Sequence, residues 1–395
     1  MHDSRVRAAI VYSALAFVFS PSLIHAQGFA VTDLGTLSGV CCSGANAINF
    51  WGEAVGESTD AILWSPRSGV RDLGTLPNGG FSSATAINFF GQVAGYSGAA
   101  DGTEHALLWT TNGGMEDLGV LPKATSSDAY GLNDFSVVVG DSSSSTGFDH
   151  AFLWTSLTGM LDIGTLPRGH ISRATAINDS DTVVGFSTIR RNSELHIYHA
   201  FLWTPRAGIR DRETLPGDDN SFAYAINQFG NVAGESLLST AGNDHAVLWT
   251  GAAGARDLGL LPGGTFSVAN ALNDSDTVVG FADFAGSGGS IHAFRWTAAV
   301  GMEDLNDLIP QDSGWTLLEA NGINLGNQIV GVGVIQGEEH AFLLTPNFHC
   351  ERGKAMGSRY AGANAGGARH APDCGPSQAN IRGSSVRLGC KRDDR

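Results

Sequence analysis

The feature that most constrains this chain is a four-segment pattern that occurs seven times between residues 31 and 345. Each copy contains the tripeptide Ala-Ile-Asn or a close variant, and the steps between successive Asn residues run from 39 to 51 residues. The seven Asn residues are Asn49, Asn88, Asn133, Asn178, Asn227, Asn273 and Asn324. A period of roughly 20–50 residues is typical of solenoids and propellers, in which each repeat buries its apolar surface against its neighbours.

Each copy is predicted to form four strands. After the Asn comes a Val-x-Gly run, then a His-Ala-Phe-Leu-Trp segment that is clearest at residues 150–154, then a Gly-Met-x-Asp-Leu-Gly segment such as residues 114–119. All are short, rich in β-branched or aromatic residues, and bounded by Gly, Asn, Asp or Ser, as strands are. The third segment is apolar on both alternating faces, which indicates that other sheets cover it on both sides.

The ends of the repeat region complement each other. A single strand of the fourth type, at residues 31–37, precedes the first full copy, while the last copy ends after its third strand at residues 340–345. The first strand can therefore complete the last sheet, which is how a β-propeller closes its ring and protects its edges. We predict an all-β, seven-bladed propeller of four-stranded antiparallel blades, with the Ala-rich segment at residues 84–86 on an innermost strand. The alternative is an open β stack with atypical capping repeats.

The recurring His-Ala-Phe, together with Asp-Leu-Gly-Thr-Leu-Pro and Ala-Ile-Asn in constant order, resembles the HAF-repeat family of bacterial extracellular repeat proteins over about residues 31–345. The resemblance implies secretion and a repeat fold, and it implies no particular activity. Two copies depart from the pattern. Arg210-Asp211-Arg212-Glu213 replaces Asp-Leu-Gly, and Leu344 stands where six other copies have Trp, so we expect looser packing in those blades.

The two ends of the chain differ from the repeat region at residues 27–347. Residues 1–26 combine Arg5 and Arg7 with an apolar run and end in Ala26, so they are predicted to be a signal peptide. That run is too short to cross a bilayer. We therefore expect a secreted or periplasmic bacterial protein with no membrane span. Residues 348–395 are basic and rich in Gly, Ala and Arg, which predicts a disordered tail.

Charge and cysteine usage restrict the partners. Residues 27–347 carry a net charge of -22, from 12 basic and 34 acidic side chains, and the tail carries +5. We expect no nucleic-acid partner, because phosphate binding needs clustered Lys and Arg. A secreted protein can form disulfides, but the pairing of five cysteines does not follow from the sequence. We expect a monomer with at least one free thiol among Cys41, Cys42, Cys350, Cys374 and Cys390.

Recurring residues with reactive side chains are interpreted as structural. Six histidines occupy equivalent positions in different repeats, and a ring would hold them too far apart to share a metal ion. We predict that each hydrogen-bonds instead, to the recurring Asp of the Asp-Leu-Gly strand, and we predict no metal and no cofactor. The histidines are His105, His150, His199, His245, His292 and His340.

Three further patterns give no catalytic residue. The segment Asn178-Asp179-Ser180-Asp181 lacks the spaced carboxylates of a calcium loop and is interpreted as a turn. Gly-x-Ser, as at residues 95–97, lacks the closing Gly of a nucleophile elbow. Six tryptophans at one repeat position are predicted to pack in the core, while Trp51 and Trp315 break the repeat and are interpreted as fillers that can be exposed. The six are Trp64, Trp109, Trp154, Trp203, Trp249 and Trp296.

Loop length points to one face of the ring. The connection between the second and third segments varies from 3 to 13 residues, and in a four-stranded blade it lies on the same face as the blade-to-blade connections. Binding residues favour loops on rigid scaffolds. We therefore expect a partner on this loop face. The candidate residues are Asp101, Asp149, Arg190, Arg191, His196, Asn243 and Ser287.

The preferred functional prediction is a secreted or periplasmic scaffold that binds a protein or a carbohydrate. Two alternatives stay open. One is an exported hydrolase or lyase that acts on a polysaccharide, lactone or ester through carboxylates near the mouth of the channel. The other is a structural protein of a surface or matrix. The sequence does not indicate which ligand is bound, because one fold hosts many unrelated functions.

Overall fold

The structure is a computed structural model that describes residues 28–37, 41–144, 147, 149–191, 196–239, 243–251, 254–286 and 288–347. The predicted signal peptide at residues 1–26 and the predicted tail at residues 348–395 lie outside these ranges, and so do Cys350, Cys374 and Cys390. Across the described part of the chain, no helix has the length and apolar character needed to cross a membrane.

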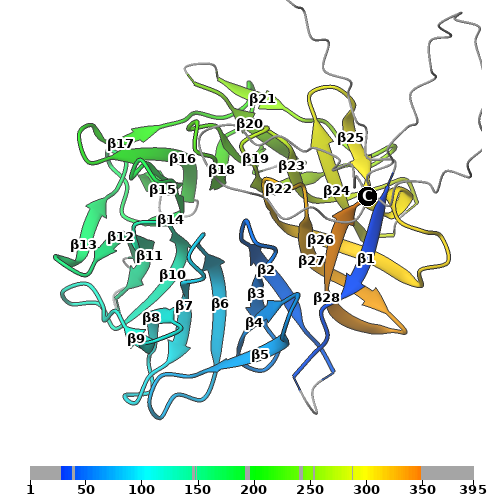
Figure 1. The fold of residues 1–395 in the computed structure, drawn as a ribbon. Coiled ribbons are helices and arrows are strands. Elements are labelled where there is room, and N and C mark those ends of the chain that lie inside the picture. The colour runs from blue at the N-terminus through cyan, green and yellow to red at the C-terminus, as the bar shows by residue number, and fades with distance from the viewer. Residues whose placement is uncertain are drawn as a thin grey trace, which may run out of the picture. The chain divides into compact units, whose positions relative to one another are not determined.

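Seven four-stranded antiparallel sheets surround a common axis (Figure 1). The first four blades are formed by β2 (Gly44–Ile48), β3 (Ala54–Glu57), β4 (Ala61–Ser65) and β5 (Gly69–Gly74); β6 (Ser82–Ile87), β7 (Val93–Gly98), β8 (Glu104–Thr110) and β9 (Gly114–Asp117); β10 (Ser126–Leu132), β11 (Val138–Ser143), β12 (Asp149–Thr155) and β13 (Gly159–Gly164); and β14 (Ser172–Ile177), β15 (Val183–Arg191), β16 (His196–Thr204) and β17 (Gly208–Asp211).

The remaining three blades follow the same order, and the last takes its fourth strand from the start of the repeat region. They are formed by β18 (Asn220–Ile226), β19 (Val232–Leu237), β20 (Asp244–Trp249) and β21 (Ala255–Asp257); β22 (Ser267–Leu272), β23 (Val278–Asp283), β24 (Ile291–Thr297) and β25 (Gly301–Asp304); and β26 (Trp315–Ile323), β27 (Ile329–Ile335), β28 (Glu338–Pro346) and β1 (Phe29–Asp33). A short 3-10 helix, Leu305–Leu308, follows β25.

The N-terminal strand closes the ring. β1 pairs antiparallel with β28, in a register that runs from Phe29 opposite Pro346 to Asp33 opposite Phe342, and the two strands lie side by side in Figure 1. Phe29 and Leu34 are buried against the last blade and its neighbours. The predicted seven-bladed propeller and its closure by the first strand are therefore confirmed.

The Val-x-Gly glycine is required by a close approach between the first two strands of a blade. A Cβ atom on Gly95 would lie 2.0 Å from the carbonyl oxygen of Ser83, so only glycine fits. On the facing strand the register shifts between Ala84 and Ala86, which leaves Thr85 in a β-bulge. The Thr85 hydroxyl donates to the carbonyl of Ala129 in the next blade, 2.8 Å away, so the bulge links neighbouring blades.

The core lies between the blades. Trp109, Trp154, Trp249 and Trp296 are buried at the predicted repeat position, and Trp64 and Trp203 are half-buried against the same kind of cluster. Small alanines on the first strands, such as Ala84, allow the inner strands to crowd around the axis. Leu344 takes the position of Trp in the last blade and is itself fully buried. The large side chains thus fill the wide outer spaces and the small ones the narrow inner spaces.

Candidate functional site

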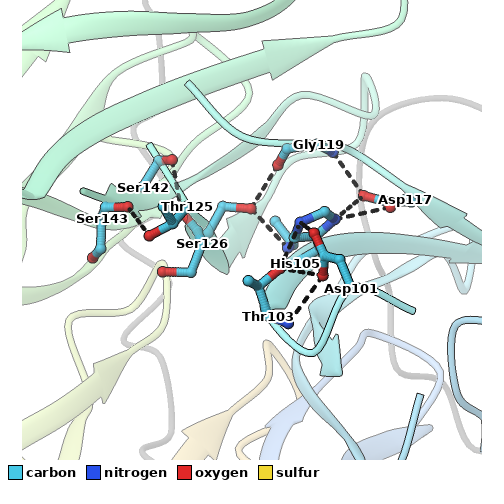
Figure 2. A network of polar contacts seen from close by, with 11 residues as sticks. Asp101, Thr103, His105, Asp117, Gly119, Thr125, Ser126, Ser142 and Ser143 are labelled. Atoms are coloured by element: carbon cyan, nitrogen blue, oxygen red, sulfur yellow. Dashed lines mark hydrogen bonds and ion pairs between the residues drawn. The ribbon is translucent and has the colours of Figure 1, made fainter. Parts of the chain in front are cut away.

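The six recurring histidines hold strands together. In each case Nδ1 contacts a carboxylate oxygen of the Asp on the fourth strand of the same blade, at 2.6–2.9 Å. Figure 2 shows one example, with His105 between Asp117 and Asp101. The predicted structural hydrogen bond is confirmed. In the described ranges, no group of three His, Cys, Asp or Glu side chains is placed to hold a metal ion.

The hydroxyl of the Gly-x-Ser pattern also has a structural role. Ser97 is fully buried, accepts the N–H of Leu76 at 3.0 Å and donates to the carbonyl of Phe81 at 2.8 Å. It therefore ties the end of a second strand to the blade-to-blade connection. The thiols of Cys41 and Cys42 are free and lie 2.7 Å apart.

The seven recurring asparagines form a closed ring of hydrogen bonds. In its own turn each Oδ1 accepts two backbone N–H groups, as Asn178 does from Ser180 and Thr182. Each Nδ2 donates to the backbone carbonyl of the equivalent Asn in the next blade, at 3.0–3.3 Å, and Asn324 donates to Asn49 to complete the circle. The sequence predicted only the turn at each Asn. The hydrogen bond between blades could not be predicted, because it forms only when the blades pack into a ring.

A cavity of about 510 Å³ opens at the axis on the face that carries these Asn turns. Its lining includes one aliphatic side chain from the end of every first strand, which confirms that the first strands are innermost. These side chains are Ile48, Ile87, Leu132, Ile177, Ile226, Leu272 and Ile323. The volume of the cavity falls within the range of roughly 300–1,000 Å³ that is typical of small-molecule sites, and its lining is about equally apolar and polar.

The rim of the cavity breaks the sevenfold repetition. The residue after each Asn also lines the cavity, and its chemistry changes around the ring. On the last, first and second blades, which are neighbours, it is Leu325, Phe50 and Phe89. On the third to sixth blades it is Asp134, Asp179, Gln228 and Asp274. We call the first set the apolar arc and the second set the acidic arc.

Hydrogen bonds between blades orient the acidic arc. One carboxylate oxygen of Asp134 accepts the N–H of Phe89, and one of Asp179 accepts the N–H of Asp134, both at 2.9 Å. Asp274 likewise accepts the N–H of Gln228 at 2.9 Å. Among the described residues no donor reaches the second oxygen of these three carboxylates. Each carboxylate is therefore held in place with one oxygen available at the rim.

Exposed aromatic side chains extend the apolar arc. Phe50, Trp51, Phe89 and Phe90 form an aromatic patch whose neighbouring ring centroids lie 5.1–5.8 Å apart. Trp51 is 50% exposed and Phe90 69%, and the indole N–H of Trp51 donates to the carbonyl of Phe89 at 3.0 Å. The filler interpretation fits Trp315, which packs edge-on against Phe342, but half of Trp51 faces solvent.

The loop-face candidates lie at the other end of the axis. Each second strand leaves the Asn turn and ends at its connection to the third strand, so these connections are on the face opposite the cavity. Asp101 and Asn243 are exposed there, and Asp149 begins β12. Arg190, Arg191 and His196 lie at the paired ends of β15 and β16, while Ser287 is outside the described residues. The predicted loop face is therefore opposite the face with the axial cavity, and a partner on the loop face stays a prediction.

A second cluster of polar and ionisable side chains lies on the inner strands of the third and fourth blades. Asp128 and Asp141 are opposite each other on β10 and β11, and the carboxylate of Asp141 contacts Nε of Arg173 at 2.7 Å. The Arg173 guanidinium covers the ring of Tyr130 at 5.1 Å. Burial raises the pKa of both Asp128 and Asp141 to about 6. Other repeats have Ser83 or Val268 at the position of Asp128, and this cluster occurs once among the residues that the structure describes.

Glu235 on β19 is a buried carboxylate in the same layer, in which Asp141 is also buried and Asp128 is half-buried. Glu235 is 9% exposed, and the hydroxyl of Tyr224 donates to its Oε1 at 2.6 Å. Burial raises the pKa of Glu235 to about 7. The folded protein therefore keeps a proton on Glu235 over a pH range in which the unfolded chain releases it.

The stability of the fold should consequently fall as pH rises from about 4.5 to 7 through this one residue. We expect Glu235→Gln, which keeps the acceptor for Tyr224, to remove that loss and to be more stable than the parent by about 3 kcal/mol at pH 8. At pH 4 the two should be equally stable. Urea unfolding at pH 4, 6 and 8 measures this, with exposed Glu116→Gln as the control. A difference that is the same at every pH would contradict the explanation.

Comparisons with known proteins agree with the fold. No family model and no curated protein matches this chain. Among solved structures, a streptogramin B lyase is similar, with a TM-score of 0.50 and 10% identity over 80% of this chain and 98% of that one. At this identity the similarity shows the propeller fold alone.

Two other solved propellers are more distant. The extracellular domain of a one-component system from B. thetaiotaomicron has a TM-score of 0.48 and 8% identity, and the match covers 81% of this chain and 40% of that one. A lectin from Burkholderia pseudomallei has a TM-score of 0.35 and 11% identity, covering 79% and 97%.

Proposed function

We propose that this protein is an exported binding scaffold and that its ligand occupies the axial cavity on the Asn-turn face. The observation that carries this proposal is the asymmetric rim. The Asn ring repeats in all seven blades because it holds the fold together, whereas the residues beside it differ from blade to blade. A rim that served folding alone would have no need of two chemically distinct arcs. Export is supported by the N-terminal segment, whose composition predicts a signal peptide.

The test of this proposal uses N-phenyl-1-naphthylamine, an uncharged apolar fluorescent probe. We expect saturable binding of one probe per chain, because aliphatic side chains from all seven blades line the cavity and offer an apolar surface. Ile177→Trp, which adds bulk to that surface, should weaken binding at least tenfold. Leu161→Trp, an exposed position on β13, should leave it unchanged. Probe binding that is absent, or equal in the two variants, would contradict the proposal.

A second candidate function, an exported hydrolase or lyase, is supported by Asp128, Asp141 and Arg173. Carboxylic acids with a pKa near 6 suit general acid–base catalysis at neutral pH, and perturbed pairs gather at functional sites. A turnover screen against polysaccharides, lactones and esters tests it. We expect Asp128→Asn to lower any such activity at least 100-fold, with Glu116→Gln as the control. Activity that survives both Asp128→Asn and Asp141→Asn would exclude this cluster as the catalytic site.

A further inference from the structure

We propose that the ligand of the axial cavity is a small amphipathic molecule with a positively charged head group. This inference rests on the proposed function, because it names the class of ligand for the same cavity. The apolar part of the ligand would contact the aliphatic side chains of the lining and the apolar arc. The head group would lie against the acidic arc on the other side of the rim.

The charge of the lining favours a cation. The described residues that line the cavity include three carboxylates and no Lys, Arg or His. One oxygen of each carboxylate accepts a backbone N–H of the neighbouring blade. The other oxygen is available to a ligand. An anionic ligand would meet only like charge at this rim. A neutral ligand would leave three oriented charges without a counterion.

Repulsion between the carboxylates of the acidic arc also favours a cationic ligand. Burial raises the pKa of Asp134, and the neighbouring negative charge of Asp179 raises it further. A cation placed between them would relieve this repulsion, because it interacts favourably with both carboxylates. The residues of the propeller carry a net charge of -22, so the field of the whole domain also attracts cations towards it.

The opposite side of the rim requires an apolar group on the same molecule. Phe50, Phe89 and Leu325 are consecutive around the ring, and 43% of Phe50 and 51% of Leu325 are exposed to solvent. A free inorganic cation would use the acidic arc and leave this surface uncovered. The volume of about 510 Å³ suits a single chain or ring system joined to its head group.

The experiment uses the full chain and three probes with the same eight-carbon tail: octyltrimethylammonium, octyl glucoside and octyl sulfate. Each competes with N-phenyl-1-naphthylamine below its micelle concentration. We expect octyltrimethylammonium to bind at least tenfold more tightly than octyl glucoside and octyl sulfate to bind most weakly. Roughly 1 M salt should reduce the preference for the ammonium, because it shortens the screening length to about 3 Å.

Two matched double variants separate charge from fold. Asp179→Asn with Asp274→Asn keeps the oxygen that accepts the backbone N–H but removes two charges from the acidic arc. We expect it to bind the uncharged fluorescent probe normally and to lose the preference for the ammonium. Glu116→Gln with Asp312→Asn removes two charges from exposed positions that do not line the cavity, and it should keep the preference.

The outcomes are distinguishable. Octyl glucoside binding as tightly as octyltrimethylammonium would overturn the cationic ligand and leave the cavity as a binding site for an uncharged one. Failure of all three octyl compounds to displace a bound fluorescent probe would overturn the amphipathic ligand. Failure of the fluorescent probe itself to bind would overturn the proposed function and this inference with it.

Discussion

Phe29→Ala should destabilise the propeller by about 3–5 kcal/mol, as expected when a fully buried phenylalanine is truncated in a core. Phe29 is 1% exposed and belongs to a cluster that includes Phe342 and Leu344 of the last blade. Its ring is also covered by the guanidinium of Arg295 at 5.4 Å. Loss of this side chain weakens the attachment of the one strand on which ring closure depends.

Urea unfolding at neutral pH measures the effect. The control is Thr32→Ala, an exposed position on the same strand, which should change the stability by less than about 0.5 kcal/mol. If both variants unfold at the same urea concentration, β1 does not contribute to stability in the way that its burial indicates.

Ring closure does not depend on Phe29 alone. Nδ1 of His340 contacts the carboxylate of Asp33 at 2.9 Å, and the N–H of Leu34 donates to the carbonyl of Ala341 at 3.0 Å. The last blade thus repeats the His–Asp contact of its neighbours, although its two partners come from opposite ends of the repeat region. Polar contacts of this kind fix the register, while the apolar burial of Phe29 and Leu34 supplies the stabilisation.

Asn178→Asp should destabilise the fold by about 3 kcal/mol at pH 7, because it places a buried carboxylate oxygen against a carbonyl oxygen. Asn178 is 2% exposed, and its Nδ2 donates to the carbonyl of Asn227 at 3.1 Å. The substitution keeps the acceptor for Ser180 and Thr182, replaces the donor to the next blade with an acceptor and adds a buried negative charge at pH 7. It therefore disrupts one link in the Asn ring and leaves the turn's own hydrogen bonds in place.

The pH dependence of this variant provides a second measurement. At pH 4 a protonated carboxyl can donate to Asn227, so we expect part of the lost stability to return. Asp179→Asn, at the next residue, keeps its acceptor for the N–H of Asp134 and should have little effect on stability at either pH. A similar loss in both variants would show that the turn tolerates no substitution, and the link between blades would not be the cause.

The repeats revealed much of the architecture because a repeated sequence can be compared with itself. Each position of the repeat appears up to seven times. A short segment that could be either a strand or part of a helix in one copy can therefore be assigned as a strand from its other copies. The unmatched first strand and the incomplete last copy then predicted how the ring closes. The same comparison led to the contact between His and the Asp of the fourth strand, because both residues recur in one blade with constant spacing.

Loop length pointed to a different face from the one that carries the cavity, and a partner on that loop face stays a prediction. Loop length directed attention to Asp101, Asp149 and Asn243, which lie at the end of the axis away from the Asn turns. The residue directly after each recurring Asn gave the useful signal. Its position in the repeat is constant, but its residue type differs from one repeat to the next. Phe50, Asp134 and Leu325 occupy this one position in different copies and have different chemistry. Asp128 and Glu235 break the repeat in the same manner.

The sequence by itself determined the number of blades, the order of their strands and the way the chain ends meet, because these depend on local patterns and on counting. Only the tertiary structure decided that seven residues, spaced 39 to 51 positions apart, surround one cavity and divide it into an apolar and an acidic side. The physical reason is that neighbours across the axis belong to different blades. Their proximity depends on how the blades pack, which no single repeat encodes.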